Sequence, residues 1–212
     1  MERLRVALSV RAPAPATPVD REWADAARRS ADALAGAGHT VREANPPYST
    51  SMMLTATGLW TAGTAADLAE LPHPDRAERR VRTHAALGRR LPARRLPRSG
   101  ARDRWRRAAE AFFADHDVLV TPALAQRPLP AVRWGERSWL ANVLGNSRYA
   151  PFAAPWNLVG WPAMTVPAGV HSTGTPVAVQ LVARPGGEGL LLSVAAQLEQ
   201  LRPWQRLAPD PA

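Results

Sequence analysis

Cysteine and lysine are both absent from the 212-residue sequence. The absence of cysteine excludes disulfides and cysteine metal sites, although it leaves the cellular compartment open. All 27 residues counted as Lys or Arg are arginines, and a guanidinium group stays protonated and cannot accept a proton. The chain therefore cannot supply the proton-accepting amine that some hydrolases use as a catalytic base.

No pattern of basic, apolar and small residues precedes the first apolar segment, RLRVALSV, so we expect no leader sequence. This predicts a cytoplasmic location. The longest stretch without charged residues runs from Tyr149 to Ala183 and is long enough to span a bilayer. Its prolines and glycines would leave too many backbone groups unsatisfied in lipid, so we interpret it as buried core and expect no membrane contact.

The composition is that of a folded protein. Hydrophobic residues make up 46% of the chain and charged residues 21%, values typical of globular domains. A chain of this length can form one domain with a sizeable core. Eight residues are tryptophans, which we interpret mostly as core or cleft lining.

The chain begins with a strand, a helix and a second strand. Apolar patterns predict a strand at Arg5–Val10, a helix at Val19–Ala37 and a short strand at Val41–Ala44. Thr17 is expected to cap the helix, because a proline and an acidic residue follow it. The glycines at 36 and 38 end this helix and open none, which favours a C-terminal cap over a phosphate-binding loop.

Residues 51–116 are expected to be helical and rich in arginine. We predict a small-residue helix through Trp60 and basic helices at Arg76–Arg90 and Arg102–His116, joined by a polar link at Arg94–Gly100. A strand at Val118–Thr121 follows.

Arginines are concentrated in these basic helices. The segment 76–107 holds thirteen arginines against Glu78 and Asp103, whereas the rest of the chain holds fourteen arginines against sixteen acidic residues. Such a surface can bind nucleic acid through phosphate contacts, which makes a basic nucleic-acid-binding or interaction module one candidate function. No recognition motif or stacking pattern accompanies the arginines, so a solvated helical face is favoured and a nucleic-acid partner is not expected.

The five histidines show no metal-binding pattern. No two are spaced i and i+4, and no carboxylate motif suited to zinc stands beside them. We predict no metal site and interpret each histidine as a surface or hydrogen-bonded residue. Asp115-His116-Asp117 suggests part of a catalytic triad, but the chain lacks a nucleophile-elbow serine, so capping and turn roles are expected.

The segment from Pro151 to Glu199 carries the most specific pattern. It predicts strands at Ala163–Val166 and Val177–Ala183, separated by a turn between two prolines, and then a helix with apolar residues at three- and four-residue spacing. Glycines and prolines recur at fixed offsets from an asparagine and a glutamine, and each fixes a backbone turn. The positions are Asn157, Gly160, Pro162, Ala163, Pro167, Gly169, Gly174, Pro176 and Gln180.

This pattern resembles the C-terminal part of amidase-signature hydrolases, in which N-x-x-G-x-P-A leads into P-x-G and then G-x-P-x-x-x-Q. The resemblance extends more weakly over nearly the whole chain, which corresponds to about the C-terminal half of a usual family member. It implies an α/β fold with a mixed sheet flanked by helices and a helical insertion. We expect a single partial domain over 1–212, with a strand–helix–strand unit at 1–50, the helical region at 51–116 and C-terminal strands and a helix at 117–212.

The resemblance also implies a reaction. Family members hydrolyse carboxamides with a Ser-Ser-Lys triad and no cofactor, and their serines lie in a Gly-Gly-Ser-Ser-Gly loop that forms the oxyanion hole. This sequence has neither that loop nor a lysine, so we expect no catalytic residue and no amide hydrolysis by the chain alone.

Three interpretations of the isolated chain stay open. An inactive or truncated amidase segment is favoured over one half of a split amidase, and both are favoured over the basic module. The expected partners are an N-terminal amidase half or a second copy of the chain, and a small amide would bind only in a complete enzyme.

The resemblance implies that a loop around Tyr149–Asn157 and the end of the strand at Val118–Thr121 approach the substrate cleft. It places four residues there: Thr121, Tyr149, Trp156 and Asn157. Ordinary packing remains an alternative for Trp156, and Asn157 could equally satisfy backbone groups where the strand begins. Ala150 stands where glutamine-dependent amidotransferases carry an aspartate. This departure argues against glutamine as the substrate and for a less polar amide.

Overall fold

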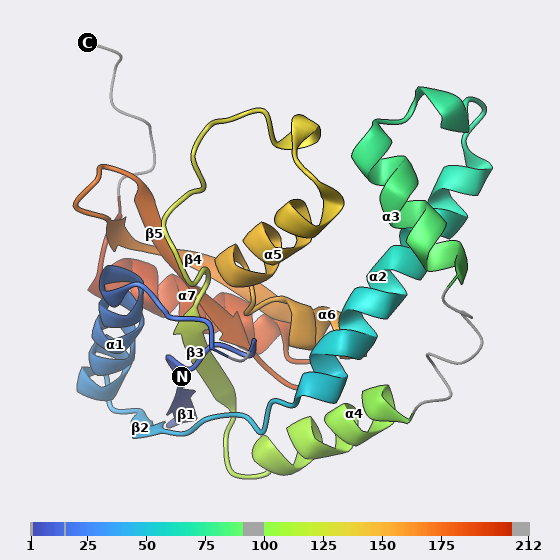
Figure 1. Ribbon diagram of the computed structural model, residues 1–212. Helices are drawn as coiled ribbons and strands as arrows, with labels where there is room; N and C mark the ends of the chain where they lie inside the picture. Colours follow the sequence, from blue (N-terminus) through green and yellow to red (C-terminus); the bar gives the residue numbers. More distant parts are fainter. Residues whose placement is uncertain (1, 15, 91–99, 205–212) are drawn as a thin grey trace.

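Five strands form one mixed sheet in the computed structural model, which describes residues 2–14, 16–90 and 100–204. The strand order is β2-β1-β3-β5-β4 (Figure 1). β1 (Arg5–Leu8) lies parallel to β2 (Thr40–Glu43) and to β3 (Val118–Pro122). β5 (Pro176–Val182) pairs antiparallel with β3 and with β4 (Ala163–Val170). The predicted α/β class with a mixed sheet is therefore confirmed.

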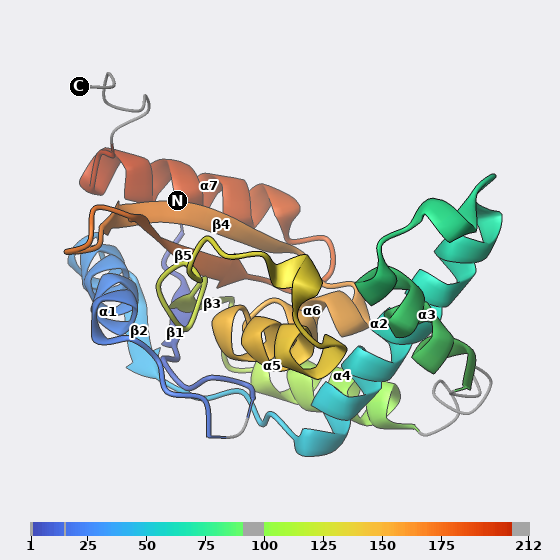
Figure 2. The ribbon, with the colours of Figure 1, turned by 45° about the horizontal axis from the view of Figure 1, so that its top comes forward.

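Helices cover both faces of this sheet. α1 (Arg21–Gly36) and α7 (Glu188–Leu201) pack on one face, and α4 (Ala101–Phe112) and α6 (Ala154–Val159) pack on the other (Figure 2). Among the described helices, none is long and apolar enough to cross a membrane.

The register of the strands sorts their side chains between these two layers. Leu8 lies opposite Val120, and Val120 opposite Leu181, so these three form a row under α1 and α7. The neighbouring residues Leu119 and Val182 form a row on the opposite face. All five are buried, and burial of a side chain of this size contributes about 1.5–3 kcal/mol. The alternation thus produces two separate cores.

Two helices form a hairpin that projects from the end of the sheet (Figure 1). They are α2 (Thr50–Glu70) and α3 (Arg79–Arg90), joined through a 3₁₀ turn at Pro74–Arg76. The helices approach closely at Gly88, where a Cβ atom would collide with the carbonyl oxygen of Thr61. A further helix, α5 (Trp139–Tyr149), packs against α3. Most of the described residues in the region expected to be helical, 51–116, lie in α2, α3 and α4, although α4 ends at Phe112 and not at His116.

Several predicted boundaries are wrong. Asp20, and not Thr17, caps α1, because Asp20 lies directly before the first turn and its carboxylate accepts a hydrogen bond from the N–H of Glu22. The helix predicted at Arg76–Arg90 begins only at Arg79, after the 3₁₀ turn. Of the predicted link Arg94–Gly100, residues 94–99 lie outside the described residues.

The first strand of the C-terminal hairpin is longer than predicted. β4 continues through Pro167, because an outer strand tolerates a residue without an N–H, and Pro167 still lies opposite Ala178. The register shifts between Pro167 and Gly169, whose φ of 131° is rarely adopted by residues with a side chain. The strand therefore ends at Val170 and not at Val166.

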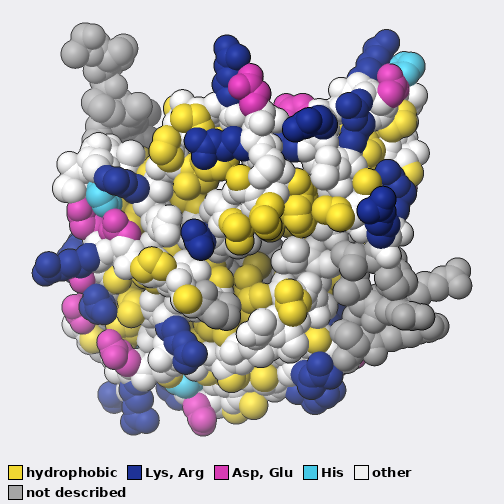
Figure 3. Space-filling model, in the orientation of Figure 1, with side chains coloured by type: hydrophobic (Ala, Val, Ile, Leu, Met, Phe, Trp, Pro, Cys, Tyr) yellow, Lys and Arg dark blue, Asp and Glu magenta, His cyan; other side chains and the backbone are white. Residues whose placement is uncertain are grey.

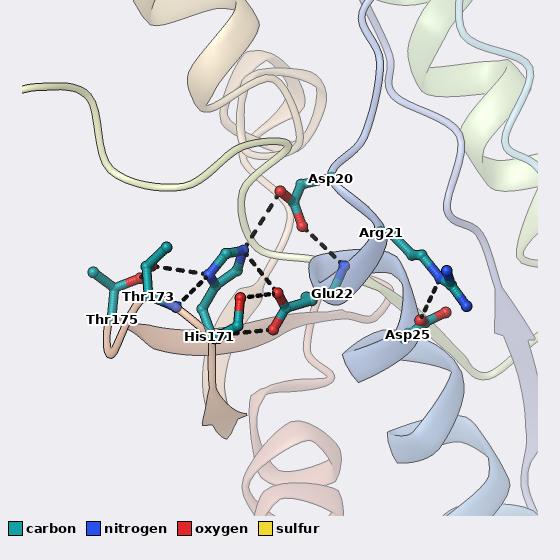
Figure 4. A network of polar contacts seen from close by, with 8 residues as sticks. Asp20, Arg21, Glu22, Asp25, His171, Thr173 and Thr175 are labelled. Carbon is teal, nitrogen blue, oxygen red and sulfur yellow. Dashed lines mark hydrogen bonds and ion pairs between the residues drawn. The ribbon is translucent and has the colours of Figure 1, made fainter.

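The turn of the β4–β5 hairpin is fastened to the start of α1 by a group of polar contacts that we call the hairpin clasp: Asp20, Glu22, His171 and Ser172 (Figure 4). Nδ1 of the buried His171 accepts a hydrogen bond from the N–H of Thr173 at 3.1 Å, which leaves the proton of the neutral ring on Nε2. Nε2 faces Oδ2 of Asp20 at 3.5 Å and Oε1 of Glu22 at 3.4 Å. Glu22 also accepts hydrogen bonds from the hydroxyl and N–H of Ser172, which lower its pKa.

Gly88→Ala tests the contact between α2 and α3. The added methyl group would collide with the Thr61 carbonyl, so we expect the free energy of unfolding to fall by about 1–3 kcal/mol, measured by urea denaturation. Gly63→Ala in α2 is the matched control, because no atom lies within 4 Å of its Cβ position and alanine favours a helix by roughly 0.5–1 kcal/mol. Equal effects of the two substitutions would contradict the close approach at Gly88.

Candidate functional site

A cavity of about 540 Å³ lies between α2, α5 and α6, and we call it the α6 cavity. Its volume falls within the range of small-molecule sites. The residues that line it are Met53, Ala56, Thr57, Leu59, Trp60, Arg102, Asn146, Ser147, Ala150, Pro151, Ala153, Ala154, Asn157 and Leu158. Many of them belong to the segment that begins with the last turns of α5 and ends in α6. In Figure 3 hydrophobic side chains gather across the middle of this side of the molecule.

Helix α6 presents Asn157 to this cavity. Pro155 lies in its first turn, where a missing N–H costs no helical hydrogen bond. Gly160 ends the helix in the left-handed region at a φ of 68°, which directs the chain into β4. The exposed Asn157 thus lies at the cavity wall on a helix whose two ends are fixed by the motif residues. The structure corrects the prediction of a loop over residues 149–157, since α6 starts at Ala154.

Trp156 lies on the other side of α6, in an aromatic cluster that supports the helix. Its side chain is fully buried, with its ring centroid 5.3 Å from that of Trp105, 5.9 Å from Phe113 and 6.0 Å from Trp161. The indole N–H of Trp105 donates a hydrogen bond of 2.8 Å to the carbonyl oxygen of Pro155. Tyr48 stacks on Trp105, and burial raises the pKa of its hydroxyl. The cluster therefore sets the position of α6 from beneath.

Thr121 and Gln180 lie under the segment that enters α6. Thr121 is fully buried in β3, and its hydroxyl donates to the carbonyl oxygen of Pro122 at 2.9 Å. Gln180 of β5 donates from Nε2 to the carbonyl oxygen of Phe152 at 3.2 Å and to Oγ1 of Thr121 at 3.5 Å. Sequence reasoning found Gln180 as a motif residue but missed this bracing role, although a glutamine within the apolar run VAVQLVA was a signal for it.

Tyr149 is the last residue of α5, and it is half-buried. Its carbonyl oxygen accepts a hydrogen bond of 2.9 Å from the N–H of Ala125, and the next residue, Ala150, lines the cavity. Of the four predicted cleft residues, Asn157 thus lines the α6 cavity, and Thr121, Tyr149 and Trp156 hold the segments around it.

The described lining residues supply polar groups for binding but no proton acceptor of the usual catalytic kind. Thr57 and Ser147 are the hydroxyls, and Arg102 is the charged group. The Thr57 hydroxyl donates to the carbonyl oxygen of Met53 at 3.0 Å. No His, Asp or Glu is among these lining residues, so none can act on Ser147 or Thr57 as a general base in the manner of a catalytic pair.

Each histidine is exposed, as His73 is, or hydrogen-bonded, as predicted. His39 is buried and accepts from the N–H of Leu4 at 3.1 Å, and Nδ1 of His116 lies 2.8 Å from the carbonyl oxygen of Phe112. Asp117 accepts hydrogen bonds from the guanidinium and the N–H of Arg5, which lower its pKa and tie the residue before β3 to β1. Within the described ranges, no group of three or more His, Asp or Glu residues is arranged to hold a metal ion.

Comparison with known proteins gives one family, named Amidase, whose sequence profile matches residues 1–192. The protein named "Putative amidase AmiB2" of Mycobacterium tuberculosis is 35% identical over 215 residues, covering 98% of this chain and 46% of that protein. The 6-aminohexanoate-cyclic-dimer hydrolase of a Pseudomonas species is 35% identical over 119 residues, or 53% of this chain and 23% of the hydrolase.

Solved structures show the same partial coverage. A structure of 6-aminohexanoate cyclic dimer hydrolase superposes with a TM-score of 0.81 at 28% identity, over 95% of this chain and 46% of that one. The chain therefore spans about half the length of the first of these curated relatives and of this solved structure.

Gln180→Met tests the brace under α6. The substitution keeps the length of the side chain but leaves the Phe152 carbonyl without its donor, so we expect a loss of about 1–3 kcal/mol in the free energy of unfolding. Gln200→Met, on the exposed side of α7, is the control and should change stability by less than about 0.5 kcal/mol. Urea denaturation gives the free energy of unfolding of both variants. Equal values would show that the hydrogen bonds of Gln180 do not stabilise the fold.

Proposed function

Because the chain belongs to the amidase family, we propose that it supplies part of the substrate cleft of a carboxamide hydrolase and does not hydrolyse amides by itself. The observation that carries this proposal is the α6 cavity, whose wall includes the beginning of the family motif segment and whose described lining contains no nucleophile paired with a base. The lack of lysine and of a Gly-Ser-Ser-Gly loop in the sequence supports it.

The proposed reaction divides between this chain and a second polypeptide segment. A serine of the other segment would attack the amide carbonyl, and its proton would pass through a second serine and a lysine to the departing nitrogen. Water would then release the acid from the acyl-enzyme ester. This chain would bind and orient the amide, because its described cavity residues offer hydrogen-bonding groups such as Asn157 but no general base.

The four cleft residues receive different proposed roles. Asn157 would contact the substrate through its side-chain amide. Thr121, Tyr149 and Trp156 would act as positioning residues, because they hold the segments that form the wall. The less polar amide expected from Ala150 agrees with the predominantly apolar lining around it.

A split enzyme is the second version of this proposal. β4 is an outer strand of the described sheet, and side chains on one of its faces, including Thr165 and Pro167, are exposed. Outer strands readily pair with strands of another polypeptide. A separate segment that carries the serines and the lysine could therefore complete the sheet along β4.

The purified chain should show no turnover above background with aliphatic or aryl amides.

To test the split version, the chain is co-expressed with the part of the mycobacterial relative AmiB2 that it does not match. The complex is then examined by size-exclusion chromatography, thermal unfolding and an assay of amide hydrolysis. We expect the chain alone to be marginally stable, since β4 has no outer partner in the described sheet. If the split version holds, the complex should restore turnover. The control complex carries serine-to-alanine changes in the added segment and should be inactive.

Three outcomes separate the alternatives. Turnover by the chain alone that survives repurification and is abolished by Ser147→Ala would overturn the proposal. A soluble complex without turnover would favour an inactive segment over a split enzyme. A well-behaved monomer with a cooperative thermal transition and no affinity for the added segment would show that the chain is an independent domain.

The arginine-rich surface supports a weaker alternative, a polyanion-binding module. Arginine side chains gather on α3, at the upper right of Figure 3, and α4 carries four more. Some are already paired, as Arg80 with Glu78 at 2.6 Å and Arg106 with Asp103 at 3.0 Å. This pairing favours a solvated face.

We expect binding of duplex DNA or structured RNA to be weak and to fade between low and physiological salt. Fluorescence anisotropy at two salt concentrations measures it. The variant Arg89→Gln, Arg102→Gln, Arg106→Gln removes three of the charges, and Arg21→Gln on α1 is the control. Tight binding at physiological salt that only the triple variant loses would promote the basic module above the amidase proposal.

A further inference from the structure

A second cavity, of about 490 Å³, lies between α2, α3 and α5, and we call it the tryptophan cavity. Three of the chain's eight tryptophans line it: Trp60 from α2, Trp134 from the 3₁₀ turn at 134–136, and Trp139 from α5. Trp60 lies more than 70 residues away in sequence from the other two tryptophans. The concentration of indole rings around one space indicates a site for a flat apolar group, because stacked and tilted aromatic pairs are favourable beyond their area.

The rings are held in place by specific contacts. The indole N–H of Trp139 donates to Nδ1 of His84 at 2.9 Å, and the His84 ring lies 4.4 Å from that of Trp60. Trp134 lies over Gly145, where a Cβ atom would be only 3.3 Å from its ring. The indole N–H of Trp134 donates to the carbonyl oxygen of Pro130 at 3.0 Å. These contacts fix the walls before any ligand enters, which reduces the entropic cost of binding.

The electrostatics of the tryptophan cavity favour an uncharged ligand. Burial lowers the pKa of His84, which favours its neutral form. The described lining residues include no carboxylate to neutralise a cation. Arg80 is the charged residue of the wall, and its guanidinium is bound to Glu78. One face of Trp134 also carries the guanidinium of Arg137, at 4.6 Å from the ring centroid, so added positive charge would be repelled.

The tryptophan cavity adjoins the α6 cavity. Trp60 and Asn146 line both. Asn146 is exposed on α5, and its side-chain amide can donate and accept at the junction. A ligand whose polar end occupies the α6 cavity could therefore place a ring among the tryptophans.

We propose that the tryptophan cavity is the subsite for the aromatic group of the substrate, so that the preferred substrates are uncharged carboxamides carrying a fused or single aromatic ring. This inference rests on the proposed function, because it assumes that the bound amide is a substrate. The binding itself does not depend on catalysis. The aromatic ring lies against Trp60, Trp134 and Trp139, and the amide lies toward Asn157.

The test compares two ligands that differ in their rings. Isothermal titration calorimetry of the purified chain measures the affinity for 1-naphthaleneacetamide and for 2-cyclohexylacetamide, which carries the same amide on a saturated ring. We expect the naphthalene compound to bind at least tenfold more tightly. Trp60→Leu and Trp134→Leu should each lower its affinity at least fivefold, because each removes an aromatic wall. Trp60 is 49% exposed, so its replacement does not disturb a core.

Trp204→Leu is the matched control, since Trp204 lies after α7, outside both cavities, and should leave the affinity unchanged. Circular dichroism spectra of all variants show whether they remain folded. Equal affinities for the two ligands, or a naphthalene affinity that neither cavity variant lowers, would overturn the inference. Ring-selective binding without turnover in the co-expressed complex would refute only the split version of the proposed function, whereas turnover without ring-selective binding would refute only this inference.

Discussion

The position of α6 depends on the aromatic cluster between the sheet and α4. Trp156 is fully buried among Trp105, Phe113 and Trp161, and Trp105 also hydrogen-bonds the carbonyl of Pro155. The same short helix presents Asn157 to the α6 cavity on its other side. Because α6 is less than two turns long and makes few hydrogen bonds of its own, packing and not helix propensity holds it. The core beneath the helix therefore determines the geometry of the cavity above it.

The glycines and prolines of the motif have identifiable structural reasons. Gly160 adopts a left-handed conformation that ends α6 and begins β4, and Gly169 adopts another where the β4–β5 register shifts. Pro167 lies in an outer strand, where a missing N–H is tolerated. Gln180 holds the segment before α6 through Phe152. The motif thus encodes a hairpin and its connection to the cavity, and it carries no reactive group. This explains how a chain without lysine can keep part of the amidase fold.

The sequence predicted the parts of the fold that local patterns encode. The strands at 5–10, 118–121 and 177–183 and the helix α1 were found because their apolar periodicities are clear. Helix α5 was not predicted, and none of its residues is buried. Helix α6 was missed because the resemblance led us to expect a loop around Tyr149–Asn157. Neither cavity could be predicted, since Trp60 and Trp139 meet only through the packing of α2, α3 and α5. Asp20 and not Thr17 caps α1, because the helix starts at Arg21, later than Pro18 suggested.

The hairpin clasp has a consequence for assembly. His171, Glu22 and Ser172 fix the turn of the β4–β5 hairpin to α1, and Gln180 fixes β5 further along toward α6. The backbone of β4 is therefore already ordered when its outer edge is free. A strand that joins this edge has to lose its own conformational freedom, about 1–2 kcal/mol for each residue. β4 is already ordered and adds no such cost. Recognition at β4 would then resemble docking onto a rigid surface more than mutual folding, and its rate would be set by how quickly the incoming strand becomes extended.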